Sequence, residues 1–244
     1  MKFNNKKVVI TGGSRGIGEA IGREFKKEGA RVAVIDKEKT QTDWEIFYQG
    51  DIAVEKDLIK FTRVVREQFK KIDYLINNAG LSKNGLLSNC SFTDFNYVLK
   101  VGVTAPYILT KLFLPYFNSG AAIINISSTR AFMSQPDTES YSAAKGGIVA
   151  LTYAMAVSLA GKVRVNSVSP GWIDVSKDSN NWTDADREQH PVKRIGKVED
   201  IAHAVLFLCN EKSGFITGEN LVVDGGMSRL MVYHNDNNWI YKSD

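Results

Sequence analysis

Short runs of β-branched and other apolar residues alternate along the chain with longer amphipathic stretches. The runs predict β-strands at Lys7–Ile10, Arg31–Ile35, Ile46–Tyr48, Tyr74–Asn77, Ala122–Ser127, Val163–Ser169 and Asn220–Val223. The stretches between them predict helices over residues 17–28, 54–70, 92–101, 105–117, 141–160 and 198–210. Because Val- and Ile-rich strands that alternate with helices are typical of parallel sheets, we expect an α/β fold, a doubly wound and mostly parallel sheet with helices on both faces. No linker-like tract interrupts the pattern, so we expect one domain over residues 1–244.

Two segments of this pattern call for a further explanation. Residues 105–117 and 147–159 are apolar on almost every side, whereas a helix that covers a sheet buries only one stripe. We therefore expect a second copy of the chain to cover the remaining apolar face, and the chain to form a homodimer or homotetramer. The segment 176–195 is polar and contains Trp182. Loops of this length inside compact domains are usually lids or binding loops, so we expect one here. A plain solvated loop is the alternative for that segment.

Composition excludes several classes of protein. The 244 residues are 43% hydrophobic and 24% charged, with a net charge of +4, so the chain is not of a disordered type. Its basic residues are scattered, which does not favour a nucleic-acid partner. The sequence has no apolar run of the ~18 residues that a membrane span needs, and its three histidines have no metal-ligand spacing. With two isolated cysteines and no signal-peptide pattern, we expect a soluble cytoplasmic protein without a metal or a membrane partner.

A glycine-rich turn follows the first predicted strand directly. Thr11–Gly18 reads TGGSRGIG, so Gly12, Gly16 and Gly18 stand where a helix begins. Such a helix N-terminus suits a pyrophosphate, because its free N–H groups and its dipole favour anions. The turn has no Lys-Ser/Thr sequel, which disfavours a P-loop. It also matches the G-x-S-x-G turn of hydrolases, but it comes too early in the chain to follow an oxyanion-hole strand.

Cofactor choice rests on Asp36, at the end of the second predicted strand. A carboxylate there accepts hydrogen bonds from the adenosine ribose and repels a 2′-phosphate, so we expect NAD, with NADP disfavoured. Arg15 and Lys37 nevertheless lie close enough in sequence to hold a phosphate, which leaves the choice open.

Ser128, Tyr141 and Lys145 form a candidate catalytic set. Ser128 follows the fifth predicted strand, Tyr141 opens the next helix, and Lys145 lies one turn further on the same helix face. This set suits acid–base chemistry at a carbonyl. A phenol titrates near pH ~10, and about 4 kcal/mol of differential stabilisation would bring it to neutrality, which the Lys145 ammonium and an oxidised nicotinamide would favour.

With these motifs the chain resembles the short-chain dehydrogenases/reductases over almost its whole length. The resemblance rests on TGGSRGIG at Thr11–Gly18, Asp51-Ile52, Asn77-Asn78-Ala79-Gly80, Ser128, Tyr141-x-x-x-Lys145, Pro170-Gly171, the run Arg194–Ile201 and Asp224-Gly225-Gly226. It implies a seven-stranded Rossmann-like sheet, Tyr141 as the acid/base, Ser128 as the group that orients the substrate, and Lys145 as a ligand of the nicotinamide ribose that lowers the Tyr141 pKa. Besides Tyr141 and Lys145, it implies a cofactor site made of Gly12, Ser14, Arg15, Gly16, Ile17, Gly18, Asp36, Asp51, Ile52, Asn78, Ala79, Gly80, Pro170, Gly171 and Ile173.

Two positions depart from the family pattern. Gly102 stands where the family usually has an Asn that supports a relay water, and Val175 stands where a Thr commonly contacts the nicotinamide amide. We expect Gly102 to leave the space that the Asn side chain would fill. The sequence therefore predicts an NAD-preferring oxidoreductase that interconverts a secondary alcohol or polyol and its carbonyl. The alternative is a catalytically weak NAD(H)-binding sensor or scaffold.

Overall fold

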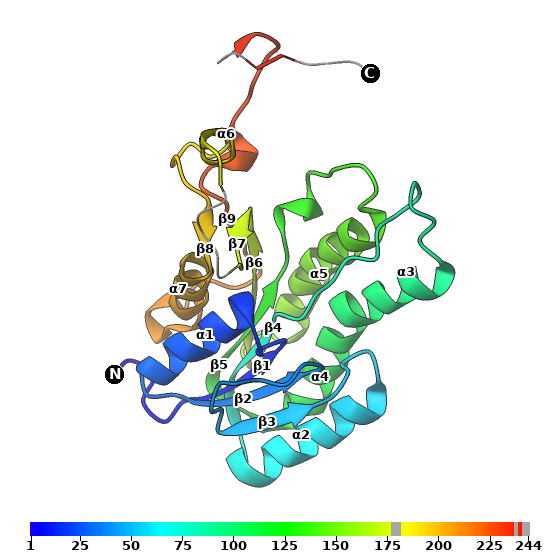
Figure 1. Ribbon diagram of the computed structural model, residues 1–244. Helices are drawn as coiled ribbons and strands as arrows, with labels where there is room; N and C mark the ends of the chain where they lie inside the picture. The colour runs from blue at the N-terminus through cyan, green and yellow to red at the C-terminus, as the bar shows by residue number, and fades with distance from the viewer. Residues whose placement is uncertain (177–181, 237–238, 241–244) are drawn as a thin grey trace.

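The computed structural model describes residues 1–176, 182–236 and 239–240. Its main sheet has seven strands in the order β3-β2-β1-β4-β5-β6-β9, and every neighbouring pair is parallel (Figure 1). The strands are β1 Lys7–Thr11, β2 Arg31–Asp36, β3 Ile46–Gln49, β4 Ile72–Asn77, β5 Phe117–Ile126, β6 Arg164–Pro170 and β9 Asn220–Val223. The expected doubly wound α/β fold is confirmed, with each strand at its predicted place.

Helices cover both faces of the sheet. One face carries α1 and α7, and the other carries α2, α4 and α5. Successive β1 residues point to opposite faces, so Val8 and Ile10 pack with α1 and α7 while Val9 packs with α2 and α4. The helices are α1 Gly16–Lys27, α2 Glu55–Phe69, α3 Phe92–Leu99, α4 Ala105–Phe113, α5 Glu139–Ser158, α6 Asp184–Glu188 and α7 Val198–Cys209.

The predicted helices 92–101 and 105–117 are one continuous helical stretch. A π-helical segment, Lys100–Thr104, joins α3 to α4, and a 3₁₀ turn, Leu114–Tyr116, ends the stretch. The predicted end at 117 was wrong: Pro115 lacks the N–H that a longer helix needs, and Phe117 already pairs with Ile72 in the sheet.

This stretch, Phe92–Tyr116, is also the one helix among the described residues that is long and apolar enough to cross a membrane. Its apolar side chains belong to the core of the fold, where Val101, Leu109 and Phe113 pack against the sheet. Burial against one face of the sheet therefore explains part of the apolar character of the stretch, while Phe92, Tyr107 and Leu114 are exposed.

The region after β6 contains structure that the sequence pattern did not predict. Two-residue strands β7 (Ile173–Asp174) and β8 (Gly196–Lys197) pair in parallel, and α6 lies between them. Thr183 and Asp186 cap α6 reciprocally. Within the expected lid 176–195, residues 177–181 lie outside the described part of the chain. Beyond β9 the chain runs past α6 and away from the sheet (Figure 1).

Candidate active site

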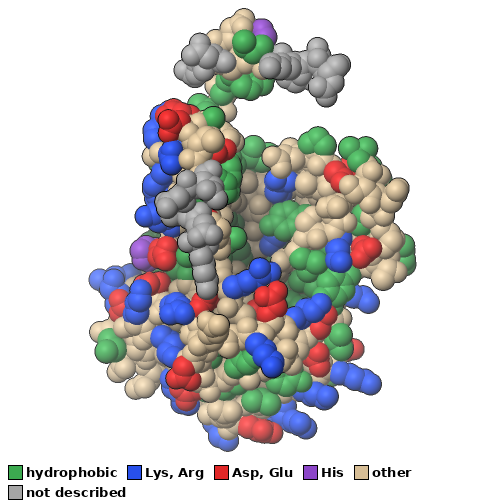
Figure 2. Space-filling view, viewed as in Figure 1, with side chains coloured by type: hydrophobic (Ala, Val, Ile, Leu, Met, Phe, Trp, Pro, Cys, Tyr) green, Lys and Arg blue, Asp and Glu red, His purple; other side chains and the backbone are tan. Residues whose placement is uncertain are grey.

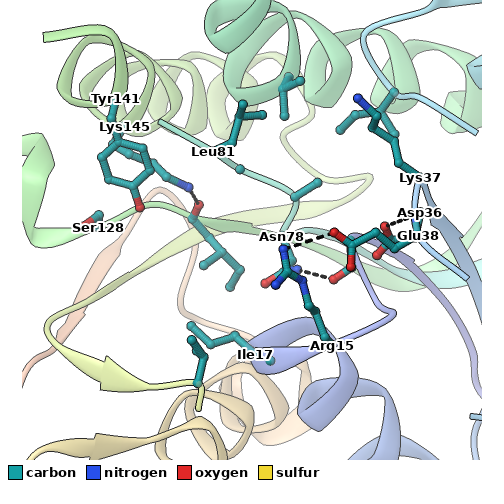
Figure 3. Close-up of a pocket in the computed structure, with 18 of the residues that line it drawn as sticks. Arg15, Ile17, Asp36, Lys37, Glu38, Asn78, Leu81, Ser128, Tyr141 and Lys145 are labelled. Atoms are coloured by element: carbon teal, nitrogen blue, oxygen red, sulfur yellow. Dashed lines mark hydrogen bonds and ion pairs between the residues drawn. The ribbon is translucent and has the colours of Figure 1, made fainter. Parts of the chain in front are cut away.

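A cavity of about 920 Å³ opens at the carboxyl ends of the central strands. It lies where β1 pairs with both β2 and β4, so the chain winds in opposite directions from this point. Crevices of this kind are the usual ligand sites of open α/β sheets. In Figure 3 the cavity has Arg15, Asp36 and Glu38 at one end, and Tyr141 and Lys145 at the other.

The glycine-rich turn has the shape that a close-lying diphosphate requires. Gly12 and Gly16 line the cavity, and both have positive φ angles, +69° and +59°. A methyl group on Gly18 would lie 2.1 Å from the Gly12 carbonyl oxygen, so only glycine lets the helix approach the turn. Asn78 fixes the same turn, since its Nδ2 donates to the carbonyls of Thr11 and Gly12 at 3.0 and 2.8 Å. The turn thus fits a dinucleotide, with free space beside the amides of the α1 N-terminus.

Asp36 lines the cavity and holds the turn in place. Its carboxylate accepts hydrogen bonds from the backbone N–H of Ser14 at 2.9 Å and of Glu38 at 3.0 Å. Ser14 and Gly18 do not line the cavity themselves; they shape the turn from behind. The remaining predicted cofactor residues do line it, namely Arg15, Ile17, Asp51, Ile52, Asn78, Ala79, Gly80, Pro170, Gly171 and Ile173.

Charged side chains at this end of the cavity are paired within the chain. Arg15 pairs with Glu38 at 3.1 Å, and Lys37 pairs with Asp51 at 3.3 Å. Tyr97, which the sequence analysis did not select, donates to Asp51 at 2.9 Å and accepts from Lys37 at 2.8 Å. Partial burial opposes ionisation of Asp51, but these hydrogen bonds hold its pKa below the ordinary value.

Ser128, Tyr141 and Lys145 lie together at the other end. Ser128 follows β5 and accepts a hydrogen bond from the backbone N–H of Arg130 at 3.2 Å. Lys145 is 4% exposed, and its Nζ donates to the carbonyl oxygen of Ile126 at 2.7 Å. The same Nζ lies 5.4 Å from the centre of the Tyr141 ring (Figure 3). α5 begins at Glu139, two residues before the predicted start, so Tyr141 and Lys145 occupy successive turns of one helix face.

Burial shifts the pKa values of Tyr141 and Lys145 away from their ordinary values. Burial raises the pKa of Tyr141, and a hydrogen bond with Ser128 and the positive charge of Arg130 offset only part of the rise. Burial also lowers the pKa of Lys145 from 10.5 to about 8. Burial thus opposes a charge on both groups, and the groups that lower the Tyr141 pKa are Ser128 and Arg130.

A second cavity, of about 1430 Å³, adjoins the first on the far side of Tyr141. Figure 2 shows the molecule hollowed between the α6 region and the body that carries α3 and α5. Ser128, Tyr141, Gly171 and Ile173 line both cavities. Polar side chains contribute much of the second wall, among them Ser82, Thr129, Arg130, Ser134, Gln135, Thr138 and Gln189.

Comparisons with known proteins agree with this geometry. A family model described as enoyl-(acyl carrier protein) reductase matches residues 12–228. A solved structure titled short-chain dehydrogenase/reductase, glucose/ribitol dehydrogenase from Brucella melitensis, superposes with a TM-score of 0.85 at 29% identity, covering 95% of this chain and 99% of that one. The chain belongs to the short-chain dehydrogenase/reductase family.

Relatives of this family support an NAD(P)-dependent oxidoreductase. An uncharacterized oxidoreductase of Thermotoga maritima is 40% identical, over 95% of this chain and 99% of its own length. The L-fucose dehydrogenase of Mus musculus is 34% identical, over 92% of this chain and 89% of its own length. An apo SCOR enzyme from Clostridium thermocellum has a TM-score of 0.91 at 42% identity, covering 99% and 100% of the two chains. A short chain dehydrogenase from Burkholderia cenocepacia, in complex with NADP, has a TM-score of 0.86 at 27% identity, covering 93% and 100%.

Gly102, the departure from the short-chain dehydrogenase/reductase pattern, lies inside the π-helical segment and is buried. A methyl group at Gly102 would lie 2.8 Å from the Ala144 Cβ, next to Lys145 in sequence. Gly147 approaches Val103 in the same way, at 3.1 Å. The expected empty space is therefore absent, because α5 packs directly against the backbone at Gly102. Val175, the other departure, lines the first cavity beside Gly16.

Most of the residues that line the second cavity were not predicted from the sequence of this short-chain dehydrogenase/reductase. Arg130 and Gln135 follow β5, and Trp172 follows β6. Their place after the carboxyl ends of strands was the available signal, since such loops meet at one edge of the sheet. Residue type alone gave none, because these side chains match no motif.

Proposed function

We propose that this oxidoreductase transfers a hydride between NAD and a secondary alcohol or polyol, or the corresponding carbonyl compound. One observation carries the proposal: Ser128 and Tyr141 stand in the shared wall between a cavity shaped for a dinucleotide and a second cavity with both polar and apolar side chains in its lining. A group there can touch both a cofactor and a substrate.

The cofactor-side cavity, the one of about 920 Å³, offers side chains and backbone for each part of NAD. Gly12, Gly16 and the α1 N-terminus would hold the diphosphate, while Asp36 would receive the ribose of the adenosine half. Asp51 and Ile52 would lie at the adenine, and Ile173 at the nicotinamide. When bound, the cofactor supplies or accepts the hydride.

Tyr141 would exchange the proton of the reacting oxygen. Burial raises the pKa of the Tyr141 phenol and so favours its protonated form, which suits a general acid for carbonyl reduction. Ser128 would hold the same oxygen, and its Oγ is already oriented by the Arg130 N–H. Lys145 would contact the nicotinamide ribose from beneath, since its Nζ faces the cavity and is anchored to the Ile126 carbonyl. For oxidation of an alcohol, the Lys145 ammonium, whose Nζ lies 5.4 Å from the centre of the Tyr141 ring, would favour the phenolate together with Arg130.

Preference for NAD rests on Asp36. Its carboxylate lines the cavity, and a 2′-phosphate placed there would meet a negative charge. The two nearby cations, Arg15 and Lys37, are engaged with Glu38 and Asp51. Binding of NADP would require one of these pairs to open.

A polyol or sugar as substrate is supported by the hydroxyl-rich wall of the second cavity. Ser134 and Thr138 line this cavity, and the Ser142 hydroxyl behind them lies within hydrogen-bond distance of each. Relatives described as L-fucose dehydrogenase and glucose/ribitol dehydrogenase support the same class.

We place the remaining expectations in the same proposal. The outer face of α4 and α5 exposes Tyr107, Tyr153 and Val157, the last at 78%, which suits a homodimer or homotetramer. Residues 176–195 would act as a lid of a single domain, and α6 already lines the second cavity. The free thiols of Cys90 and Cys209 suit a reducing compartment such as the cytoplasm.

The test is cofactor absorbance at 340 nm with NADH and NADPH against sugars, polyols, ketones, steroids and ketoacyl thioesters. We expect turnover with NADH and a polyol-derived carbonyl. Cofactor binding without turnover of any compound would instead favour the sensor, which was suggested by Gly102.

A further inference from the structure

Arg130 occupies a distinctive place beside the proposed catalytic residues. It lies in the 3₁₀ turn Thr129–Ala131, immediately after Ser128, and it lines the substrate-side cavity. Its backbone N–H binds Ser128 Oγ, while its guanidinium donates to the side-chain oxygen of Gln135. Its charge also reaches Tyr141, where it favours the phenolate. Arg130 therefore presents a cation close to the reacting position.

The pairing of Arg130 differs from that of the other cations around the two cavities. Among the described residues, Arg130 forms no ion pair, and its hydrogen-bond partner is a neutral amide. The other lysine and arginine side chains outside the proposed catalytic set each meet a carboxylate, in the pairs Arg15–Glu38, Lys37–Asp51, Lys83–Asp94 and Lys193–Glu188. A guanidinium without a counter-charge can form charge-assisted hydrogen bonds with an anion directly, whereas a cation already paired with a carboxylate must first give up that partner.

The acidic groups that line the same cavity are already engaged. The Asp186 carboxylate accepts from the backbone N–H and the hydroxyl of Thr183, and so caps α6. Glu188 pairs with Lys193. Among the described residues that line this cavity, no carboxylate is therefore left free to neutralise Arg130.

We propose that Arg130 receives an anionic group, a carboxylate or a phosphate, carried by the substrate. This rests on the proposed function, and it narrows the substrate from a neutral polyol to a sugar acid or a sugar phosphate. The planar guanidinium can donate two parallel hydrogen bonds to either anion. The hydroxyls of Ser134 and Thr138 in the same wall would bind the polyol part.

The experiment compares two ligands that differ only at one end, D-gluconate and D-glucitol. Their binding to the full chain is measured by calorimetry in the presence of saturating NADH, which prevents oxidation of the alcohol. A charge-assisted contact predicts that wild type binds gluconate roughly 10- to 100-fold more tightly than glucitol. Raising the salt concentration should reduce this preference.

Arg130→Gln should bring the ratio of the two affinities close to one, and Arg130→Lys should restore part of it. Lys193→Gln combined with Glu188→Gln is the matched control, because it removes a cation from the same cavity together with its carboxylate partner. It should leave the ratio unchanged. D-glucitol 6-phosphate serves as the third ligand and shows which anion is preferred.

The proposal is overturned if wild type binds gluconate and glucitol 6-phosphate no better than glucitol, or binds none of them. It is also overturned if Arg130→Gln weakens all three ligands equally, since that result would make Arg130 a structural clamp on Gln135. If Arg130→Gln does not fold, the salt dependence of wild type and the Arg130→Lys ratio decide. Because the readout is binding, it can fail while the absorbance panel succeeds, and the reverse.

Discussion

The two cavities on either side of Tyr141 are built by different means. The cofactor side consists of a glycine turn, backbone amides and charges that pair with one another, as in Arg15–Glu38 and Lys37–Asp51. The substrate side consists of loops after β5 and β6 together with α6, and its cation Arg130 has only a neutral partner. The charges of the cofactor side are balanced within the chain, whereas the charge of Arg130 on the substrate side is left for the proposed anionic group of the substrate. A fold can therefore keep one fixed half while the other half sets the choice of substrate.

The largest effect should come from Tyr141, which borders both cavities. Tyr141→Phe keeps the ring and removes the exchangeable proton, so kcat should fall ~10²–10⁴-fold while the Kd of NADH stays within a factor of a few. Stopped-flow absorbance and fluorescence titration measure the two quantities. A variant with a near-normal rate would assign the proton to another group and break the division between the halves.

Lys145 tests whether the cofactor half carries a stability penalty. Its pKa of about 8 in the folded chain lies below the ordinary 10.5, so burial of the ammonium opposes folding at neutral pH. Lys145→Met should abolish turnover and raise the free energy of unfolding at pH 7, by up to about 3 kcal/mol.

The pH dependence provides the control for this variant. Between pH 8 and 10.5 the unfolded wild type binds a proton that the folded chain has released, so the stability of wild type rises with pH in this window. The advantage of Lys145→Met in urea unfolding should shrink over the same window. An advantage that is constant with pH would mean that packing, not the charge, is responsible.

Gly102 tests how closely α5 must pack on the π-helical segment behind the site. Gly102→Ala places a methyl group 2.8 Å from the Ala144 Cβ and should destabilise the chain by about 2 kcal/mol, although alanine is the better helix former. The double variant with Ala144→Gly removes the clash and should recover much of that loss. Equal stability of wild type and Gly102→Ala in chemical denaturation would show that the two helices separate freely.

Asp36 gives the smallest of these effects. Asp36→Ala removes the negative charge that faces a 2′-phosphate, and the ratio of NADPH to NADH affinity should rise about tenfold, a difference of ~1.4 kcal/mol. Thr42→Ala, away from the cavity lining, is the control and should leave the ratio unchanged. A wild type that already prefers NADPH would contradict the role given to Asp36.

Much of the cofactor half could be predicted from sequence, for a physical reason. A diphosphate is bound by backbone, so its site requires glycines at fixed spacing, and Gly12 and Gly16 lie where that spacing put them. Strand positions followed from Val- and Ile-rich runs, since a strand buried on both faces tolerates little else.

The rest depended on contacts between distant segments. No local pattern shows that Tyr97 joins Lys37 to Asp51, or that Ala144 fills the space beside Gly102. The ionisation of Lys145 was likewise beyond the sequence, because a pKa depends on how deeply a side chain is buried.

The contact between Gly102 and Ala144 also limits which pairs of residues these two positions can hold. In this backbone geometry an asparagine at position 102 is admitted only after Ala144 has become glycine or α5 has moved outward. Glycine at position 144 alone would destabilise the helical turn that carries Lys145, because glycine is a poorer helix former than alanine. Each of the two substitutions made singly is therefore expected to lower the stability of the chain. The side chains at positions 102 and 144 are therefore coupled: a larger residue at one position requires a smaller residue at the other or an outward shift of α5.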